Sequence, residues 1–493
     1  MGRVTAAPKA PTIYDAVPYR TLARPATHPD RMAVLGRIFG LDCPHPNAAR
    51  VLEVGCGNGS NIIPMALSLP GSEFLGIDLA TTAVQQGAER AAAAGVTNVR
   101  LEVGDIAELG AEIGEFDYVI AHGVFSWVPD HVREALLALI RRQMRPNGVA
   151  FISYNALPGD QIRSVVRQML KVHTAGIEPA TKKLAAARAF LDLLARAPDS
   201  AADIYGPLLR SEIGKVILSS DDTLFHDDLS EYNEPYYVSD FMAKAGRHGL
   251  QFLAETPFHT MSAGGLPDEM VQLLREMAAK DIVLKEQYLD YFRCRGFRQT
   301  LLCHREAVLS RAVTIERMRQ FGYAGDVPRA EEPDGRPGVV AFKHANGSAI
   351  RTDNPMTIGA LDAMRAAAPR SVPFEDLAKA AGADDEAAQQ ALAGSLFQMF
   401  GAGLIEPRLH EPRVATVVSE RPRATPWAAV GAIPEGIATL YHEMADISDA
   451  ARTLLALADG TRTVPEIARA AAMPEGEARE GLEALARLAL LVG

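Results

Sequence analysis

The sequence predicts an α/β fold with a Rossmann-like sheet at its centre. Residues 51–54 form an apolar strand that runs directly into a loop with glycine at positions 55, 57 and 59. Strand and helix patterns then alternate at the spacing of α/β proteins as far as residue 155. Alternating glycines let a backbone turn tightly and approach a ligand, while the helix that follows presents its N–H groups. These observations predict a cofactor site at the end of the first strand.

The glycine loop distinguishes between two kinds of cofactor site. A dinucleotide-binding loop requires a third glycine three residues after the second, and Ser60 occupies that position. The spacing that is present, an acid at 53 followed by three alternating glycines, resembles the first motif of class I S-adenosylmethionine-dependent methyltransferases. The resemblance implies S-adenosyl-L-methionine, and not NAD, as the cofactor. It also implies that the loop binds this cofactor through Glu53, Gly55, Cys56, Gly57, Asn58, Gly59 and Asn61.

Two further acids lie where the same family places them. The second strand ends in Asp78, followed by Leu79. An acid there accepts the ribose hydroxyls in methyltransferases and in NAD enzymes alike, so Asp78 does not separate the two families. Asp105 closes the third strand, where the methyltransferase pattern places an acceptor for the adenine amino group and where Ile106 would pack on the ring. Each acid alone fits an ordinary strand-end or N-cap carboxylate, but their order favours the methyltransferase interpretation.

The fourth and fifth strands end in loops that face the methyl group in this fold. An apolar, aromatic wall there would favour loss of the proton from an amine acceptor, because desolvation lowers the amine pKa. The aromatic side chains fit a hydrophobic core equally well, and the histidine could accept a proton or orient the cofactor. The candidate catalytic residues are His122, Phe125, Trp127, Tyr154 and Asn155, and His122 and Gly123 are also expected at the cofactor.

The remaining strands of the sheet are expected far along the chain. A long helical pattern at about 161–215 follows the fifth strand, and the next strand patterns are at 250–255 and 297–304. The strands before it are expected at 73–78, 99–105, 116–121 and 148–155, with helices at 62–69 and 129–144. The predicted domains are a cofactor-binding core with an N-terminal lid at 1–156, a helical insertion or regulatory domain at 157–235, the rest of the core at 236–306, a linker at 307–338 and a winged-helix-like region at 339–493. Candidate lid residues are Tyr14, Tyr19 and His28, and Asp30 is expected to cap the helix that follows them.

The C-terminal region contains two similar helical units after a hairpin that turns at Asn346 and Gly347. Each unit resembles a winged helix, so nucleic acid is one partner to consider. Residues 371–410 hold six acids and two basic residues, and residues 441–493 hold nine acids and five basic residues. Without clustered Lys or Arg the electrostatic term that dominates DNA affinity is missing, so no nucleic acid partner is expected. Protein binding, packing on the core or a homodimer are the alternatives.

Composition excludes several further classes. The 493 residues carry a net charge of −11, which argues against binding along phosphate backbones. No run of eighteen apolar residues and no apolar signal core are present, so no membrane span is expected and the cytoplasm is the expected compartment. The four cysteines show neither CxxC nor metal-ligand spacing, which indicates free thiols and no metal site.

Five motifs beyond the generic methyltransferase pattern, at 121–129, 153–159, 232–238, 248–255 and 286–292, sharpen the resemblance to one family. These motifs look like those of proteins that carry a methyltransferase regulatory domain, a group that includes the rickettsial-type protein-lysine methyltransferases. The resemblance implies a helical middle domain, a C-terminal winged-helix region and a protein lysine as acceptor. One departure is Asp160, where family members often carry Trp at a place that could help to hold a substrate chain.

The sequence therefore predicts an S-adenosylmethionine-dependent methyltransferase, with lysine side chains of a protein as the leading acceptor. A small-molecule methyltransferase is the alternative enzyme, although the Asn/Asp-Pro-Pro-Tyr signature of nucleobase and glutamine methylation is absent. A regulator that binds the cofactor and acts through its winged-helix-like region is the alternative without catalysis. Every recognisable cofactor residue lies between 53 and about 127, so the insertion and the C-terminal region are expected to select the acceptor and to contribute little to cofactor binding.

Overall fold

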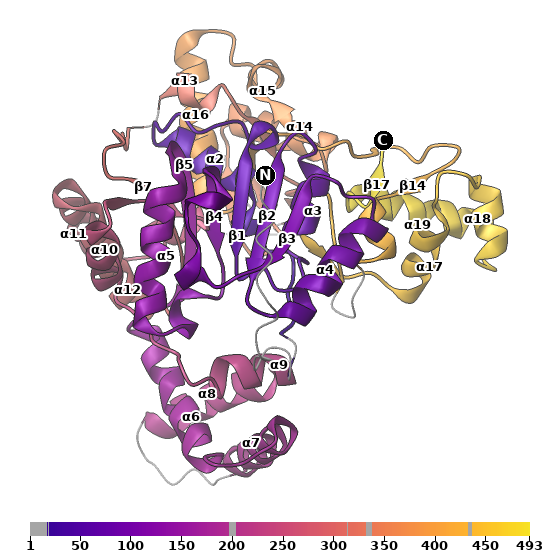
Figure 1. Ribbon diagram of the computed structural model, residues 1–493. Helices are drawn as coiled ribbons and strands as arrows, with labels where there is room; N and C mark the ends of the chain where they lie inside the picture. The colour runs from indigo at the N-terminus through magenta and orange to yellow at the C-terminus, as the bar shows by residue number, and fades with distance from the viewer. Residues whose placement is uncertain (1–16, 18, 197–203, 313, 332–337, 432–435) are drawn as a thin grey trace.

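The computed structural model describes residue 17 and residues 19–196, 204–312, 314–331, 338–431 and 436–493 (Figure 1). At its centre lies a seven-stranded sheet with the strand order β3-β2-β1-β4-β5-β7-β6. Strands β1 to β5 are parallel, whereas β7 is antiparallel to both β5 and β6. This mixed sheet confirms the predicted fold class of the core. The strands are β1 (Arg50–Val54), β2 (Glu73–Asp78), β3 (Val99–Val103), β4 (Phe116–Ala121), β5 (Met144–Asn155), β6 (Leu250–Glu255) and β7 (Phe297–His304).

The middle of the sheet is buried because helices pack against it. Strand β4 is buried at every position, and β1 at every position except Arg50. Such strands are apolar on both faces, which is why their sequence shows continuous runs rather than an alternation. The helices that pack on the sheet are α2 (Pro29–Ile38), α3 (Ile62–Ser68), α4 (Thr81–Ala93), α5 (Asp130–Gln143) and α10 (Val238–Arg247).

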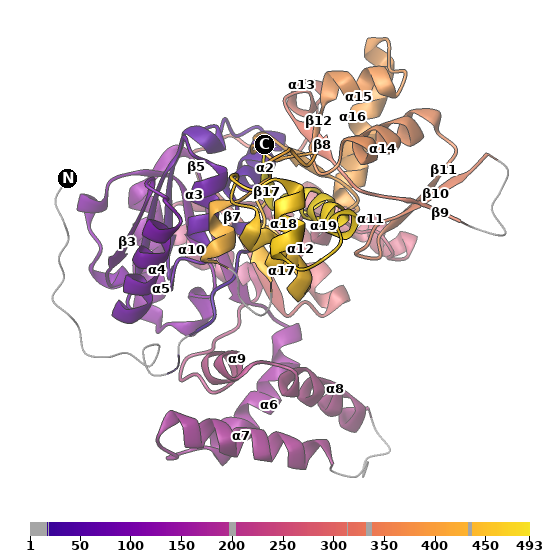
Figure 2. The ribbon, with the colours of Figure 1, turned by 90° about the vertical axis from the view of Figure 1, so that its right-hand side faces the viewer.

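The helical insertion forms a lobe below the sheet, with its own small hydrophobic core (Figure 2). The predicted long helical stretch is divided into α6 (Gly159–His173), α7 (Ala180–Ala195) and α8 (Tyr205–Ile217), followed by the short α9 (Asp221–Thr223). Asp160 is buried in this lobe, where its two carboxylate oxygens accept hydrogen bonds of 3.0 and 3.1 Å from the Arg167 guanidinium. The residue that departs from the family pattern therefore has a structural partner.

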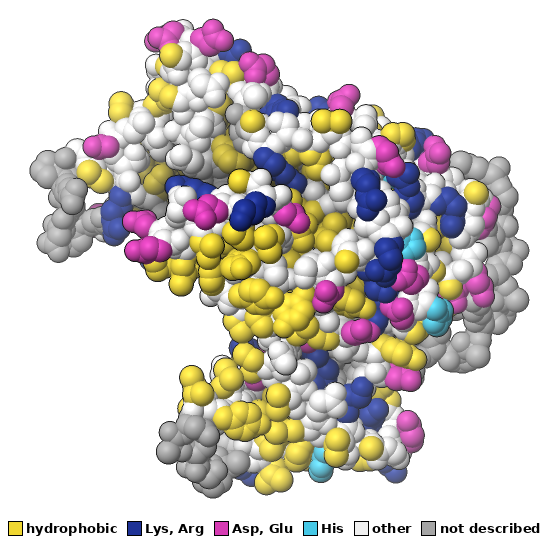
Figure 3. All heavy atoms as spheres, turned by 90° about the vertical axis from the view of Figure 1, so that its left-hand side faces the viewer, with side chains coloured by type: hydrophobic (Ala, Val, Ile, Leu, Met, Phe, Trp, Pro, Cys, Tyr) yellow, Lys and Arg dark blue, Asp and Glu magenta, His cyan; other side chains and the backbone are white. Residues whose placement is uncertain are grey.

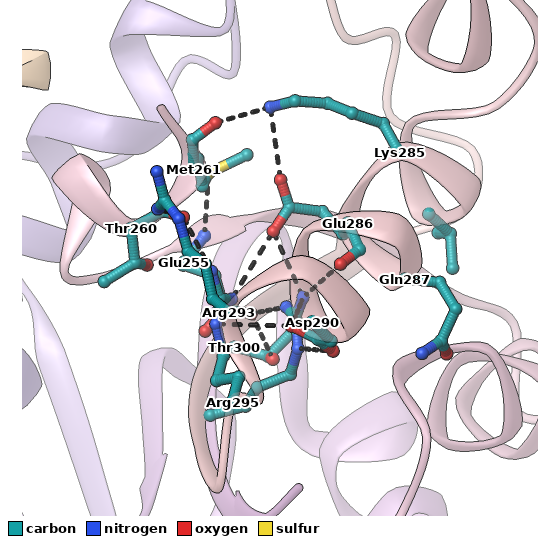
Figure 4. A network of polar contacts seen from close by, with 12 residues as sticks. Glu255, Thr260, Met261, Lys285, Glu286, Gln287, Asp290, Arg293, Arg295 and Thr300 are labelled. Carbon is teal, nitrogen blue, oxygen red and sulfur yellow. Dashed lines mark hydrogen bonds and ion pairs between the residues drawn. The ribbon is translucent and has the colours of Figure 1, made fainter. Parts of the chain in front are cut away.

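A buried ion network fixes the edge of the sheet where β6 and β7 meet α12 (Ile282–Arg293), the helix that follows α11 (Asp268–Lys280). Figure 4 shows Glu255, Glu286 and Asp290 turned toward one another from β6 and α12. The fully buried Arg298 donates to all three carboxylates, over 2.6 to 3.2 Å. Burial raises the pKa of Asp290 to about 6. Since buried charges need partners, this network holds α12 against the sheet.

The region that the sequence predicts as a linker, 307–338, contains regular structure. It includes α13 (Ile315–Met318), β8 (Gly322–Ala324) and β9 (Arg329–Ala330). Composition misses these strands because each has only two or three residues and depends on pairing with another strand. Strand β8 pairs with β12 (Val372–Pro373) and β13 (Glu406–Arg408), and β9 pairs with β10 (Val340–Lys343) of the predicted hairpin, whose second strand is β11 (Ala349–Thr352).

The two C-terminal helical units lie beside the sheet domain (Figure 1). Their buried side chains belong to the same continuous hydrophobic core as the sheet, so this region packs as part of the main body. The winged-helix description of the units stays a prediction. No helix among the described residues is long and apolar enough to cross a membrane. The elements are α14 (Pro355–Ala367), α15 (Phe374–Ala380), α16 (Glu386–Gly401), β14 (Arg423–Ala424), β15 (Ile437–Ala438), β16 (Met444–Ala445), α17 (Asp449–Leu457), α18 (Val464–Ala470), α19 (Glu475–Arg487) and β17 (Leu491–Val492).

Candidate active site

The glycine loop after β1 adopts backbone conformations that require glycine. Gly55, Gly57 and Gly59 have φ angles of +75°, +53° and +71°. A Cβ atom on Gly55 would lie 2.6 Å from Val124, and one on Gly57 would lie 2.5 Å from the Thr21 hydroxyl. Side chains at these positions would therefore be strained and would clash with the neighbouring loop.

A cavity of about 320 Å³ opens above this loop, at the carboxyl ends of the parallel strands. Strand β1 lies between β2 and β4, so the strand order reverses here, and α/β sheets bind ligands at such a switch point. Most of the predicted cofactor residues line this cavity. These are Glu53, Gly55, Gly57, Asn58, Asn61, Asp78, Leu79, Asp105, Ile106, His122 and Gly123, and Trp127 lines it as well.

Asp78 and Asp105 are both oriented by backbone N–H groups. The two oxygens of Asp78 accept from the backbone nitrogens of Gly57 and Ala80, each at 2.8 Å. Asp105 accepts from the nitrogen of Ala107 at 3.0 Å and so caps the short helix that follows β3. A carboxylate oxygen can accept more than one hydrogen bond, so both acids are pre-positioned and can also bind ligand hydroxyl or amino groups.

Glu53 carries a buried acceptor at the cavity. Its Oε1 accepts from the Asn61 amide nitrogen at 2.7 Å, whereas its Oε2 has no hydrogen-bond partner among the described residues. Burial raises the pKa of Glu53 to about 8, with the nearby Asp78 carboxylate adding to the effect. A ligand ammonium beside Oε2 would supply the missing partner and favour the charged carboxylate. The α-amino group of an amino-acid cofactor fits this requirement.

His122 and Trp127 line the cavity from the loop after β4. The buried His122 Nδ1 and Trp127 Nε1 have no hydrogen-bond partner within the part of the chain that the structure describes. Burial and the Arg24 charge lower the pKa of His122 to about 3, so its ring is neutral near pH 7. A neutral ring with a free nitrogen can orient a ligand by hydrogen bonding, but it is too weak a base to hold a proton at that pH.

Three predicted catalytic residues do not line the cavity. Phe125 is fully buried and packs with its ring centroid 5.1 Å from that of Phe241, and Tyr154 stacks on the same ring at 4.2 Å. The Tyr154 and Thr300 hydroxyls lie 3.3 Å apart, and Thr300 donates to Glu255, which connects Tyr154 to the ion network at the sheet edge. Asn155 is buried as well, and its amide nitrogen donates to Asn233 at 2.8 Å. These side chains shape the core behind the site, and the prediction that they form its wall is wrong.

Cys56 and Gly59 also do not line the cavity, although they belong to the glycine loop. The Cys56 side chain is buried beside β2, where its sulfur lies close to Gly76, and burial raises the pKa of its thiol. A Cβ atom on Gly59 would lie 2.7 Å from Ile63, so this glycine serves the packing of the loop onto the helix that follows it.

The N-terminal segment, which the sequence predicts as a lid, lines one side of the cavity. Tyr19, a candidate lid residue, does line it, but His28 lies elsewhere and caps α2 by accepting from the nitrogen of Asp30. Asp30 is therefore not the cap, and it accepts instead from backbone nitrogens of the C-terminal region. Tyr14 lies outside the described residues. Alternation and spacing gave no signal for the other lining residues, which include Arg20, Thr21, Leu22, Arg24, Gln86, Val124, Pro129 and Val132.

Comparison with known proteins agrees with this geometry. A family model described as "Methyltransferase domain" matches residues 51–148, and one described as "Predicted methyltransferase regulatory domain" matches residues 220–304. The Rickettsia prowazekii protein RP028 is 33% identical over 240 residues, which is 49% of this chain and 96% of that protein. RP789 of the same organism is 34% identical over 308 residues, which is 62% of this chain, so the chain spans only 55% of its length.

Two solved structures cover nearly the whole chain. PKMT2 from Rickettsia typhi is 26% identical, with a TM-score of 0.83, over 97% of this chain and 100% of that one. Its complex with AdoHcy, the product form of S-adenosylmethionine, matches with a TM-score of 0.84 at 25% identity over the same shares. The buried acceptor of Glu53, the two oriented acids and the glycine loop fit this cofactor. The chain belongs to the class I S-adenosylmethionine-dependent methyltransferases that carry a methyltransferase regulatory domain.

Proposed function

We propose that this methyltransferase N-methylates lysine side chains of a protein. The observation that carries the proposal is an exposed aromatic side chain beside the candidate methyl-transfer end of the cavity. The Phe297 ring, which is 37% exposed, packs edge-on against His122 with a centroid distance of 6.3 Å. Tyr291, on the helix that precedes β7, is 50% exposed. Apolar side chains gather on the face of the molecule that carries α11 and α12 (Figure 3).

The proposed site roles follow from these positions. The bound cofactor supplies an activated methyl group, so the protein has to position it and to desolvate a neutral nucleophile. Asp78 and Asp105 would hold the ribose and the adenine, and Glu53 would pair with the α-ammonium group. His122 and Trp127 would form the polar and apolar sides of the transfer site. Because His122 stays neutral, loss of the lysine proton would depend on desolvation among aromatic side chains.

The comparisons support the same acceptor class. The name PKMT2 suggests protein lysine methylation for the Rickettsia typhi protein, whose fold this chain shares along its length. With a protein acceptor, the insertion and the C-terminal region would supply recognition surface, since macromolecular recognition needs extended surface. The domain boundaries at 157–235 and 339–493 are part of this proposal.

A labelling experiment tests the acceptor. The full-length protein is incubated with methyl-labelled S-adenosylmethionine and a cell lysate, with a matched lysate whose lysines have been acetylated as the control. The proposal predicts label in protein, recovered as methyl-lysine after hydrolysis, and loss of that label in the acetylated lysate. Label in the small-molecule fraction would support the alternative enzyme. Cofactor binding without any transfer would support the regulator.

A further inference from the structure

The C-terminal region reaches the cofactor loop through the tip of the hairpin formed by β15 and β16. His442 lies at this tip, with a left-handed φ of +64°, and is fully buried. Its Nε2 lies 2.9 Å from the amide oxygen of Asn61, 381 positions away in the chain. Asn61 is the same residue whose amide nitrogen donates to Glu53. A side chain of the C-terminal region thus contacts a residue that lines the cofactor cavity.

The hydrogen bonds around Asn61 fix the direction of this contact. The Asn61 amide nitrogen donates to Glu53 at 2.7 Å and to the Thr27 hydroxyl at 3.0 Å, so its oxygen can only accept. That oxygen also accepts from the backbone nitrogen of Arg24 at 2.8 Å. His442 must therefore donate from Nε2, which leaves its Nδ1 without a proton. Accordingly, Nδ1 is buried with no partner within the described ranges, and burial lowers the pKa of His442 to about 3.

We propose that His442 is a positioning residue for S-adenosylmethionine. By donating to the oxygen of Asn61, it holds the amide in the orientation that presents its nitrogen to Glu53. A reversed amide would place an oxygen against Glu53, where it could accept only from a protonated carboxyl group and would oppose the ionised form that pairs with the cofactor ammonium. His442 thus acts on the cofactor through Asn61 and Glu53, without touching the cofactor itself.

A second contact from the same region braces the other side of the loop. Trp427, which is buried, lies under the guanidinium of Arg90, 5.9 Å from the ring centroid. Arg90 donates to the Ser60 hydroxyl at 3.0 Å, and Ser60 donates to the side-chain oxygen of Asn58 at 2.7 Å. This geometry speaks against the expectation that the C-terminal region contributes little to cofactor binding. The sequence does not indicate these contacts, because His442 and Trp427 lie far from the loop along the chain.

The test compares substitutions at His442 in the full-length protein. His442→Phe keeps a ring of similar size and removes the donor, so the Asn61 oxygen loses a buried hydrogen bond. Isothermal titration calorimetry with S-adenosylhomocysteine should then show a dissociation constant raised about ten-fold. His442→Gln retains an amide donor and should restore most of the affinity. Because the readout is product binding, the result does not depend on the identity of the methyl acceptor.

His410→Phe is the matched control. His410 donates to the backbone oxygen of Ser68 at 2.8 Å and lies in the same interface between α3 and the C-terminal region. Both Phe variants should lower the unfolding temperature, but only His442→Phe should weaken binding. If the His442→Phe protein is too unstable to purify, His442→Ala and His410→Ala replace the two Phe variants. Equal effects of the two substitutions on binding, or a change of less than two-fold at 442, would overturn the proposal.

A double-mutant cycle tests the route through Asn61. In an Asn61→Ala protein, His442→Phe should cause little further loss of affinity, because the group that it positions is absent. Additive losses would show that His442 acts by another route and would contradict the relay.

Discussion

Replacing Glu53 with Gln should remove a pH dependence from the binding of S-adenosylhomocysteine. In the free protein, burial raises the pKa of Glu53 to about 8, so the group is mostly protonated at pH 7. A ligand ammonium beside Oε2 favours the carboxylate, so binding should release the proton. With a pKa near 8 in the free protein and full ionisation in the complex, affinity should rise by up to about 50-fold between pH 6 and pH 8 and then level off.

Calorimetry at pH 6, 7 and 8, in two buffers with different heats of ionisation, measures both the dissociation constant and the number of protons released on binding. The unaltered protein should release about 0.9 protons per site at pH 7, and Glu53→Gln should release none from this group. Titration of the ligand amine affects both proteins equally, so it cancels in the ratio of their dissociation constants. His122 and His442 have pKa values of about 3 and do not titrate in this range. The reasoning fails if the two proteins show the same pH dependence.

Four further outcomes are expected. Asp78→Ala should raise the dissociation constant for S-adenosylhomocysteine by about ten-fold or more, since it removes charge-assisted hydrogen bonds, with an unchanged circular dichroism spectrum. Gly57→Ala should abolish binding in the same titration, because its Cβ would lie 2.5 Å from Thr21. Phe125→Leu should lower the free energy of unfolding in urea by about 1 kcal/mol while leaving the dissociation constant unchanged, because Phe125 is a core residue. Truncation after Gly338 should weaken cofactor binding, measured by calorimetry. The truncation removes His442 as well as β12 and β13, the strands that pair with β8. Equal affinity of the truncated and full-length proteins would contradict the proposed brace.

The sheet could be predicted because its signals are local. Strands β2 and β4 have the predicted bounds, since each is a continuous apolar run between clear turns. Strands β8 and β9 could not be predicted, because strands of two or three residues show no periodicity of their own and exist only through pairing; the partners of β8 also lie far along the chain. Length and composition carry no record of such partners.

The site residues that lie directly after a strand could be predicted from the sequence. Asp78, Asp105 and His122 lie at the carboxyl ends of parallel strands, which converge at one edge of the sheet, and all three line the cavity. Aromatic residues on the same loops gave no such guide. Trp127 faces the cavity, whereas Phe125, two positions earlier, is enclosed by Tyr236 and Phe241. Residue type and spacing alone do not determine which ring faces the ligand.

The contacts of the C-terminal region connect it to the cofactor loop. Its buried side chains join the core of the sheet domain, and His442 and Trp427 lie behind the two asparagines of the cofactor loop. A contact that orients the cofactor loop must itself be affected by cofactor binding, because coupling between two sites is reciprocal. A partner that shifts the β15–β16 hairpin would therefore change the affinity for S-adenosylmethionine, and the cofactor would change the affinity for that partner by the same factor. The C-terminal region and the cofactor site then behave as one connected body rather than as separate modules.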